Sequence, residues 1–282
     1  MPAECSGDGE HFLERWAGDW NTAADWSGAV VPGAADTVTI VGAGAYTVTL
    51  YTAAAADNLM LNAPGALFYD AGALTIGGTL ALQGGTLDLA YGSLAGGTLA
   101  MAGGILEASG GTLNGVAVQG ALAVDQTDAT LFVQGGLAMA GAGGVGTGTL
   151  AVTGTYATVD FLGTQSLSHA VVTLGASAAG QGQGGPASIQ VQHLYGATAR
   201  ATLTLATNVW LQQAGQLGQI IIGGALPGAL TDEVINAGTI TAATFGGTLE
   251  IDGSGDFLNT GTIGISNDAT LDIASAGFTG II

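Results

Sequence analysis

Few side chains in this chain of 282 residues could support acid–base chemistry. The sequence has 21 acidic residues and three histidines, but only two basic residues, Arg15 and Arg200, and no lysine. A lyase that removes a proton beside a uronate needs a strong base, usually arginine or lysine. Arg200 is the only basic side chain in the repeat region described below, and we interpret it as a solvent-facing strand residue.

Paired carboxylates are the second candidate chemistry. An inverting glycosidase uses two carboxyl groups about 6.5–9.5 Å apart. Glu250 and Asp272 are separated by one length of the repeat described below, which would stack them in neighbouring coils. We interpret them as outward, solvated residues. Two other acidic pairs are typical of turns, namely Asp125 with Asp128 and Asp232 with Glu233.

Metal ligands and catalytic histidines are also sparse. The segment from Asp252 to Asp256 places oxygens at alternate positions, as Ca²⁺ loops do, but it lacks the bidentate glutamate of a full site. We therefore predict a turn without metal there, with Ca²⁺ as the alternative. His169 and His193 lack a serine and aspartate arrangement, since the stretch from 161 to 231 contains no acidic residue. We read both as surface or loop residues, and we predict no catalytic residue, no metal site and no cofactor.

The charge balance excludes several classes of partner. The formal net charge of −19 opposes binding to nucleic acid, because phosphate binding needs clustered lysine and arginine. The same charge opposes an anionic membrane surface. No apolar run is long and unbroken enough to predict a membrane-spanning helix. No signal peptide is visible either, because Asp8, Glu10 and Glu14 occur where an apolar stretch would lie.

The composition predicts a folded β-rich chain. Glycine contributes 51 residues, yet 48% of the chain is hydrophobic and the mean hydropathy is +0.49. The glycines alternate with leucine, valine, isoleucine, alanine and threonine, whereas a disordered linker would be polar. Only five prolines occur and no strict Gly-X-Y period exists, which excludes collagen. Cys5 is the only cysteine, so no disulfide can form within the chain.

Short apolar-x-apolar units recur from about Leu74, each followed by Gly-Gly or a similar turn. Strands this short are stable only if each coil of chain stacks on the last. Three recurrences in the C-terminal part give the length of the period. The segment Val234-Ile235-Asn236-Ala237-Gly238-Thr239-Ile240 recurs from Phe257 to Ile263. Thr248-Leu249 recurs as Thr270-Leu271, and Phe257 recurs as Phe278.

These recurrences predict the fold. We expect an all-β, single-stranded, right-handed parallel β-helix with coils of about 22 residues, about eleven of them from Val38 onwards. Right-handedness follows the rule for parallel crossovers.

Three local features complete this prediction. Phe12, Leu13 and Trp16 have helical spacing, which predicts a short helix over residues 8–19. This helix belongs to a predicted cap segment of residues 1–36, which precedes a β-helix over residues 37–282. Asn236 recurs as Asn259, which predicts a buried asparagine ladder. Residues 175–186 break the pattern and are expected to loop out.

The segment from Trp20 to Ile40, Trp-Asn-Thr-Ala-Ala-Asp-Trp-Ser-Gly followed by Val-Pro-Gly-Ala-Ala-Asp-Thr-Val-Thr-Ile, resembles a module of large secreted proteobacterial proteins. There it introduces β-helical repeats of the autotransporter and filamentous-haemagglutinin-like adhesin kind. The Asn-Ala-Gly-Thr-Ile and Asn-Thr-Gly-Thr-Ile units are similar to repeats of the same proteins. The resemblance implies this fold and an extracellular or cell-surface location.

Two functions remain open at this point. The first is a structural or adhesive stalk or filament-forming segment, not an enzyme. Its partner would be the rest of a longer chain or another copy joined end to end, with a host or surface glycan as a further candidate. The second is a carbohydrate-binding or carbohydrate-cleaving β-helix. A carbohydrate binder should show exposed aromatic side chains in file, and Trp210 and Tyr195 are the late candidates.

Overall fold

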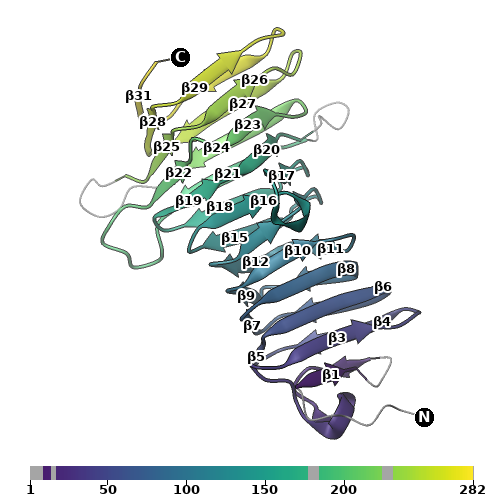
Figure 1. The fold of residues 1–282 in the computed structure, drawn as a ribbon. Coiled ribbons are helices and arrows are strands. Elements are labelled where there is room, and N and C mark those ends of the chain that lie inside the picture. Colours follow the sequence, from purple (N-terminus) through teal and green to yellow (C-terminus); the bar gives the residue numbers. More distant parts are fainter. Residues whose placement is uncertain (1–8, 14–16, 177–183, 224–230, 282) are drawn as a thin grey trace. The chain divides into compact units, whose positions relative to one another are not determined.

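The computed structural model describes residues 9–13, 17–176, 184–223 and 231–281. This part of the chain is almost entirely β-structure, and its coils stack so that each strand pairs in parallel with its counterpart one coil later (Figure 1). The prediction of an all-β chain with long, stacked parallel sheets is confirmed. The chain forms two compact units, Met1–Gly120 and Ala121–Ile282, and the expected cap segment belongs to the first.

The first unit contains two parallel sheets. The strands of its larger sheet are β1 (Glu10–Phe12), β2 (Gly18–Asp19), β3 (Thr37–Val41), β4 (Tyr46–Leu50), β6 (Asn58–Asp70), β8 (Thr79–Leu89), β10 (Thr98–Met101), β11 (Ile105–Glu107) and β13 (Ala117–Gln119). The strands of its smaller sheet are β5 (Ala53–Ala56), β7 (Ala73–Ile76), β9 (Ser93–Ala95) and β12 (Ser109–Asn114). Two 3₁₀ turns, η1 (Ala23–Asp25) and η2 (Ser27–Ala29), lie between β2 and β3.

The second unit contains three parallel sheets. The first sheet holds β16 (Leu137–Ala140), β19 (Gln165–Ser168), β22 (Thr202–Leu205), β25 (Glu233–Asn236), β28 (Asp256–Asn259) and β31 (Gly277–Thr279). The second sheet holds β15 (Thr130–Gln134), β18 (Thr158–Leu162), β21 (Ala187–Gln192), β24 (Leu217–Ile222), β27 (Thr248–Gly253) and β30 (Thr270–Ile273). The third sheet holds β14 (Ala121–Val124), β17 (Gly148–Val152), β20 (Ala170–Leu174), β23 (Trp210–Gln213), β26 (Thr239–Ala242) and β29 (Thr262–Ile265), and a 3₁₀ turn, η3 (Ala142–Gly144), precedes β17.

Alternation of residue types builds these strands. In β4 the side chains of Tyr46, Val48 and Leu50 are buried, whereas Thr47 and Thr49 between them are partly exposed. Successive side chains of a strand point to opposite faces, so every second residue enters the core of the coil. The core of both units is accordingly leucine, valine, isoleucine and alanine in stacked columns.

The predicted coil length is confirmed at the C-terminal end. Val234 pairs with Phe257, and Phe257 pairs in turn with Phe278. Thr248 pairs with Thr270. These are the same pairs that the recurrences in the sequence align. The registers read from the sequence are therefore the registers of the sheets.

Coils elsewhere depart from this period. In the first unit Thr79 pairs with Thr98, so the coil between them is shorter than those at the C-terminal end. In the second unit Thr158 pairs with Ser188, and that coil is longer because longer connections lie between its strands. A uniform period therefore describes only part of the chain. Most of the predicted loop over residues 175–186 lies outside the described residues.

The prediction of a helix over residues 8–19 is wrong for the residues described there. Glu10–Phe12 form strand β1, which pairs in parallel with Thr37–Thr39 of β3. A helix of this length is marginal by itself, whereas the edge of β3 offers unpaired backbone groups that a strand satisfies. Glu14–Trp16 lie outside the described residues.

Two tryptophans close the core of this first coil. Trp20 and Trp26 are fully buried, with ring centroids 5.1 Å apart in an edge-on arrangement, and Trp20 stacks on Phe68 of β6 at 5.7 Å. The indole N–H of Trp26 donates to the carbonyl oxygen of Trp20 over 2.7 Å. Aromatic pairs of this kind add to the stabilisation that comes from their buried area.

The predicted asparagine ladder is present. Asn236 and Asn259 are buried and paired in register, and the Asn236 amide donates to Oδ1 of Asn259 over 2.7 Å. Oδ1 of Asn236 accepts the backbone N–H of Gly238 at 3.1 Å. A Cβ at Gly261, the equivalent of Gly238 one coil later, would lie 2.1 Å from the Gly238 carbonyl oxygen. The Asn-x-Gly spacing thus combines a buried amide with a close approach of two backbones.

Candidate functional site

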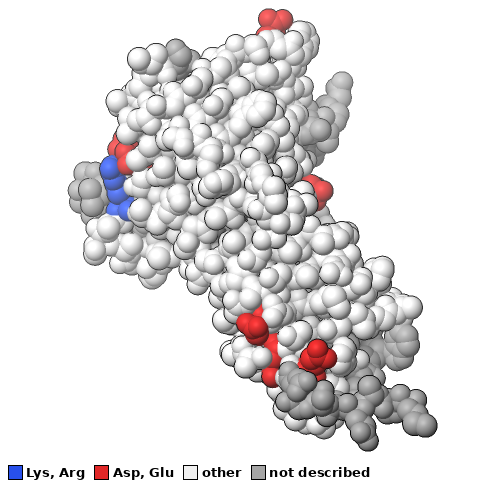
Figure 2. Space-filling view, viewed as in Figure 1, with Lys and Arg blue, Asp and Glu red and all other residues white. Residues whose placement is uncertain are grey.

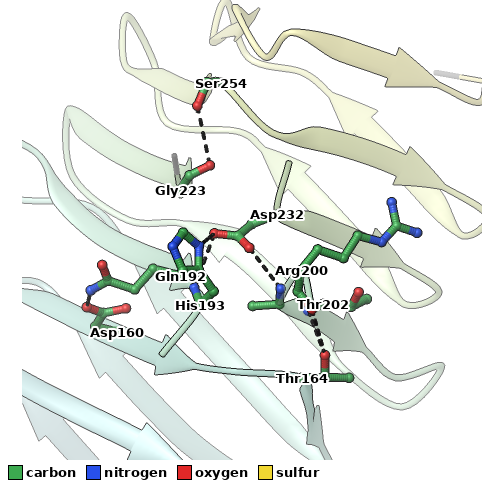
Figure 3. A network of polar contacts seen from close by, with 10 residues as sticks. Asp160, Thr164, Gln192, His193, Arg200, Thr202, Gly223, Asp232 and Ser254 are labelled. Atoms are coloured by element: carbon green, nitrogen blue, oxygen red, sulfur yellow. Dashed lines mark hydrogen bonds and ion pairs between the residues drawn. The ribbon is translucent and has the colours of Figure 1, made fainter. Parts of the chain in front are cut away.

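A polar network occupies a corner of the second unit, where the second sheet gives way to the first (Figure 3). We call it the corner network; its centre is Asp232, which directly precedes β25 and is fully buried. One carboxylate oxygen accepts the backbone N–H of Ala201 at 2.8 Å. The other accepts the backbone N–H of His193 at 3.2 Å and lies 3.0 Å from its Nδ1. Because His193 follows β21 and Ala201 precedes β22, Asp232 ties both ends of one connection together.

The interpretation of His193 as a histidine without a carboxylate partner is wrong, and so is that of Asp232 as an ordinary turn residue. Asp232 is distant in sequence, but it comes from the next coil and therefore lies beside the ring. The absence of acidic residues from 161–231 says little about proximity in a solenoid, because residues one coil apart are neighbours.

The chemistry of this pair is that of an oriented imidazole. The Asp232 carboxylate lies 3.0 Å from Nδ1 and so fixes the orientation of the ring. Both oxygens of Asp232 already have partners, and these include two backbone N–H groups. We therefore read Asp232 first as a clamp on the connection 193–201.

Arg200 belongs to the same corner, and the expectation that it is a strand residue is wrong. It lies just before β22, its side chain is 44% exposed, and its Nη2 is 2.9 Å from the Glu233 carboxylate. Its Nη1 is 3.9 Å from Asp256, which pairs with Glu233 one coil later. Figure 2 shows blue basic atoms beside red acidic ones on one face of the molecule. Two stacked carboxylates thus hold the guanidinium, and its positive charge compensates their negative charges in place of a bound cation.

A second buried carboxyl group lies beside the corner network. Asp160 of β18 is almost fully buried, and the side-chain amide of Gln192 donates to its Oδ2 (Figure 3). Burial raises the pKa of Asp160 to about 6, while the hydrogen bond from Gln192 opposes that rise.

The first unit contains a comparable group at Asp70. Asp70 is fully buried at the end of β6, in register with Leu50 on one side and Leu89 on the other. Burial raises its pKa to about 6, and the N–H of Gly72, which it accepts at 2.9 Å, acts in the opposite direction. The burial of Asp70 and Asp160 was not predicted from the sequence. For Asp70 it could have been predicted, because stacking of coils aligns this residue with a leucine in each neighbouring coil.

Glu250 and Asp272 stack in adjacent strands, as predicted. Glu250 is partly buried and accepts from the Gln219 amide at 3.0 Å, while Asp272 is exposed. Burial raises the pKa of Glu250, and the charges of Asp252 and Asp272 raise it further. Directly stacked strands are about 4.8 Å apart, closer than the separation that leaves room for a water molecule in an inverting pair. The arrangement is an acidic column on an outward face.

The carboxylates of the predicted turn over residues 252–256 face different partners. Asp252 is in β27, with Oδ2 3.5 Å from the Gln219 amide, whereas Asp256 is in β28 and accepts the Thr231 hydroxyl at 3.1 Å. Within the described residues, no group of three or more histidine, cysteine, aspartate or glutamate side chains could hold a metal ion. Cys5 lies outside that part of the chain, and the absence of a metal site stays a prediction.

The remaining candidates lie apart from the corner network. Asp128 adopts a left-handed backbone conformation (φ 59°) in the turn before β15, in keeping with its expected turn role. His169 is at a turn before β20, where its backbone N–H donates to Oδ1 of Asn208. Tyr195 is fully exposed in the connection 193–201, and Trp210 is half-exposed at the start of β23.

Comparisons with family models, with curated proteins and with solved structures found no match to this chain. Among the described residues, no helix is long and apolar enough to cross a membrane.

Proposed function

We propose that this chain is a structural and adhesive segment of an extracellular stalk: a right-handed, single-stranded β-helix that joins to a further coil at its C-terminal end and carries no catalytic centre. The resemblance of Trp20 to Ile40 to the modules of secreted adhesins supports the export and surface display in this proposal. The geometry of the last described coil is the observation that carries it.

Residues of the last coil are exposed at positions that are buried one coil earlier. Their partners in the preceding coil, Ala242, Leu249, Ile251 and Phe257, are at most 1% exposed. The last coil instead presents Ile265, Leu271, Ile273 and Phe278, all at least partly exposed, with Ile265 at 47%. We call these four residues the end face. Apolar side chains and the open edges of β29, β30 and β31 suit another coil stacked on them.

The first coil of the first unit differs in this respect. Trp20 and Trp26 fill the first coil and are fully buried, so the core there is closed by the chain's own residues. Two copies that meet through the same end face are related by a two-fold axis and close as a pair. In a longer protein the same face would receive the next coil of the same chain.

The polar groups of the second unit fit this role. Asp232 uses its carboxylate on backbone N–H groups and His193, and Arg200 is held by Glu233 and Asp256. These contacts join neighbouring coils, which supports a structural role.

Sedimentation velocity over a range of protein concentrations tests the joining role. We expect the native chain to form a dimer as concentration rises and Ile265→Lys to weaken it, because the lysine places a charge on the end face. Ile105→Lys is the matched control, since Ile105 is 55% exposed and lies in the first unit. A native chain that is monomeric at all concentrations, or equal weakening by both variants, would contradict the proposal.

A further inference from the structure

A cavity of about 410 Å³ opens on the outward side of the third sheet of the second unit. Residues of successive coils line it, namely Thr147, Ala170 and Val171, Thr207 to Trp210, and Thr239. Val171, Trp210 and Thr239 are register partners, so Trp210 stands in the middle of an outward column. The volume lies in the range of small-molecule sites.

Trp210 is fixed in a way that leaves its ring available. Its indole N–H donates to the Thr241 hydroxyl at 3.0 Å, yet 47% of the residue is exposed. The one polar atom of an indole is therefore satisfied within the protein, and the exposed side-chain area is aromatic carbon. Tyr195 is more exposed still, but it does not line this cavity.

Uncharged hydrogen-bonding groups surround the ring. Thr147, Thr207, Asn208 and Thr239 line the cavity, and none of the described residues that line it is ionisable. Oδ1 of Asn208 accepts the backbone N–H of His169 at 2.9 Å, which anchors the turn over Thr207 and Asn208 to the preceding coil. The site is thus preorganised on strands and an anchored turn, which limits the entropy lost on binding.

We infer that this cavity binds a neutral carbohydrate, with one face of a sugar ring on Trp210 and its hydroxyl groups on the threonine and asparagine side chains. A pyranose has an apolar C–H face and a rim of hydroxyls, which match an aromatic ring bordered by uncharged donors and acceptors. The net charge of −19 opposes anionic sugars. No residue of the end face lines the cavity, so this inference does not depend on the joining role.

Isothermal titration with a panel of neutral disaccharides (cellobiose, maltose, lactose and chitobiose) tests the inference, with digalacturonate as the anionic comparison. We expect binding of at least one neutral disaccharide and none of digalacturonate. Trp210→Ala should weaken binding about tenfold or more, as loss of a central aromatic contact does, and Trp210→Phe should weaken it less. Phe245→Ala, a change at an exposed aromatic that does not line the cavity, should leave affinity unchanged.

A second variant guards against a folding effect. Thr207→Val keeps the side-chain shape and removes one hydroxyl, so it should weaken binding while the thermal unfolding midpoint stays constant. The inference is overturned if the native protein binds none of the four disaccharides, if Trp210→Ala binds as the native protein does, or if digalacturonate binds equally well. Titrations repeated in the Ile265→Lys background separate this outcome from the dimer test.

Discussion

At the scale of the residue, the buried amide of Asn236 holds successive coils together. It donates to Asn259 and accepts from Gly238. Asn236→Ala leaves the Gly238 N–H and the Asn259 Oδ1 without these partners inside the protein. Each of these two unsatisfied buried groups costs about 1–3 kcal/mol, so we expect a loss of roughly 2–6 kcal/mol in the free energy of unfolding. Urea denaturation measures it, with the exposed Asn114→Ala as control; equal effects of the two changes would refute a special role for the ladder.

Asp70 gives a prediction about pH. Its pKa is raised to about 6 in the folded protein from 3.8 in the unfolded chain. The folded state therefore holds this proton over an interval in which the unfolded state has lost it, so stability falls as the pH rises from about 4 to about 6 and then levels off. Asp70→Asn removes this loss, since the amide oxygen can still accept from Gly72.

We expect Asp70→Asn to be more stable than the native protein at pH 8, with the difference shrinking as the pH falls through about 6 and vanishing near 4. Thermal unfolding of both proteins across that range measures the difference in stability. Taking this difference cancels the effects of overall charge that the two proteins share. Asp125→Asn, a change at an exposed carboxyl group, is the control. A stability difference that stays constant with pH would show that burial does not hold the proton on Asp70.

The chemistry of single residues was only partly predictable. Asn236 over Asn259 and Glu250 over Asp272 followed from the repeat alone, because identical or similar residues recur at the coil length. Asp232 beside His193 did not, because the intervening coil is longer than those from which the repeat was read. In a repeat protein, the neighbours of a carboxylate can be predicted only after the residue has been assigned to its position in a coil.

At the scale of the element, glycine sets how closely two turns approach. A Cβ at Gly261 would lie 2.1 Å from the Gly238 carbonyl oxygen, whereas a Cβ at Gly264 would lie 3.6 Å from the Thr241 methyl group, an ordinary contact. We expect Gly261→Ala to destabilise the protein by about 1–3 kcal/mol through forced separation of the coils, and Gly264→Ala to be neutral or slightly stabilising. Chemical denaturation of the pair decides the point, and similar effects of both changes would contradict it.

In two segments, pairing with a neighbouring strand gave a secondary structure that differs from the one the local sequence pattern predicts. Phe12, Leu13 and Trp16 have helical spacing, yet Glu10–Phe12 form a strand because β3 offers an edge to pair with. Gly84-Gly85 is one of the Gly-Gly pairs that follow an apolar-x-apolar unit and are predicted to form turns, but both residues lie inside β8. Gly85 adopts a left-handed conformation (φ 83°) there, close to a carbonyl oxygen of the preceding coil, so the pair bends the strand without ending it. Neither outcome can be read from a window of local sequence.

At the scale of the whole molecule, the repeat predicted the architecture better than its dimensions. Stacked parallel sheets followed from apolar alternation and three recurrences of similar length. The shorter coil after Thr79 and the longer one after Thr158 did not, since the length of each connection is free to vary while the strands keep their register. The division into units between Gly120 and Ala121 likewise has no composition signal that we recognised.

The proposed role of the whole chain is to join coils through its end face. Negative-stain electron microscopy of the purified chain at raised concentration, beside Ile265→Lys, examines this joining in single particles. We expect particles joined in pairs for the native chain and single particles for the variant. Single native particles at every concentration would contradict the role, and turnover of a polysaccharide by them would favour the carbohydrate-cleaving alternative.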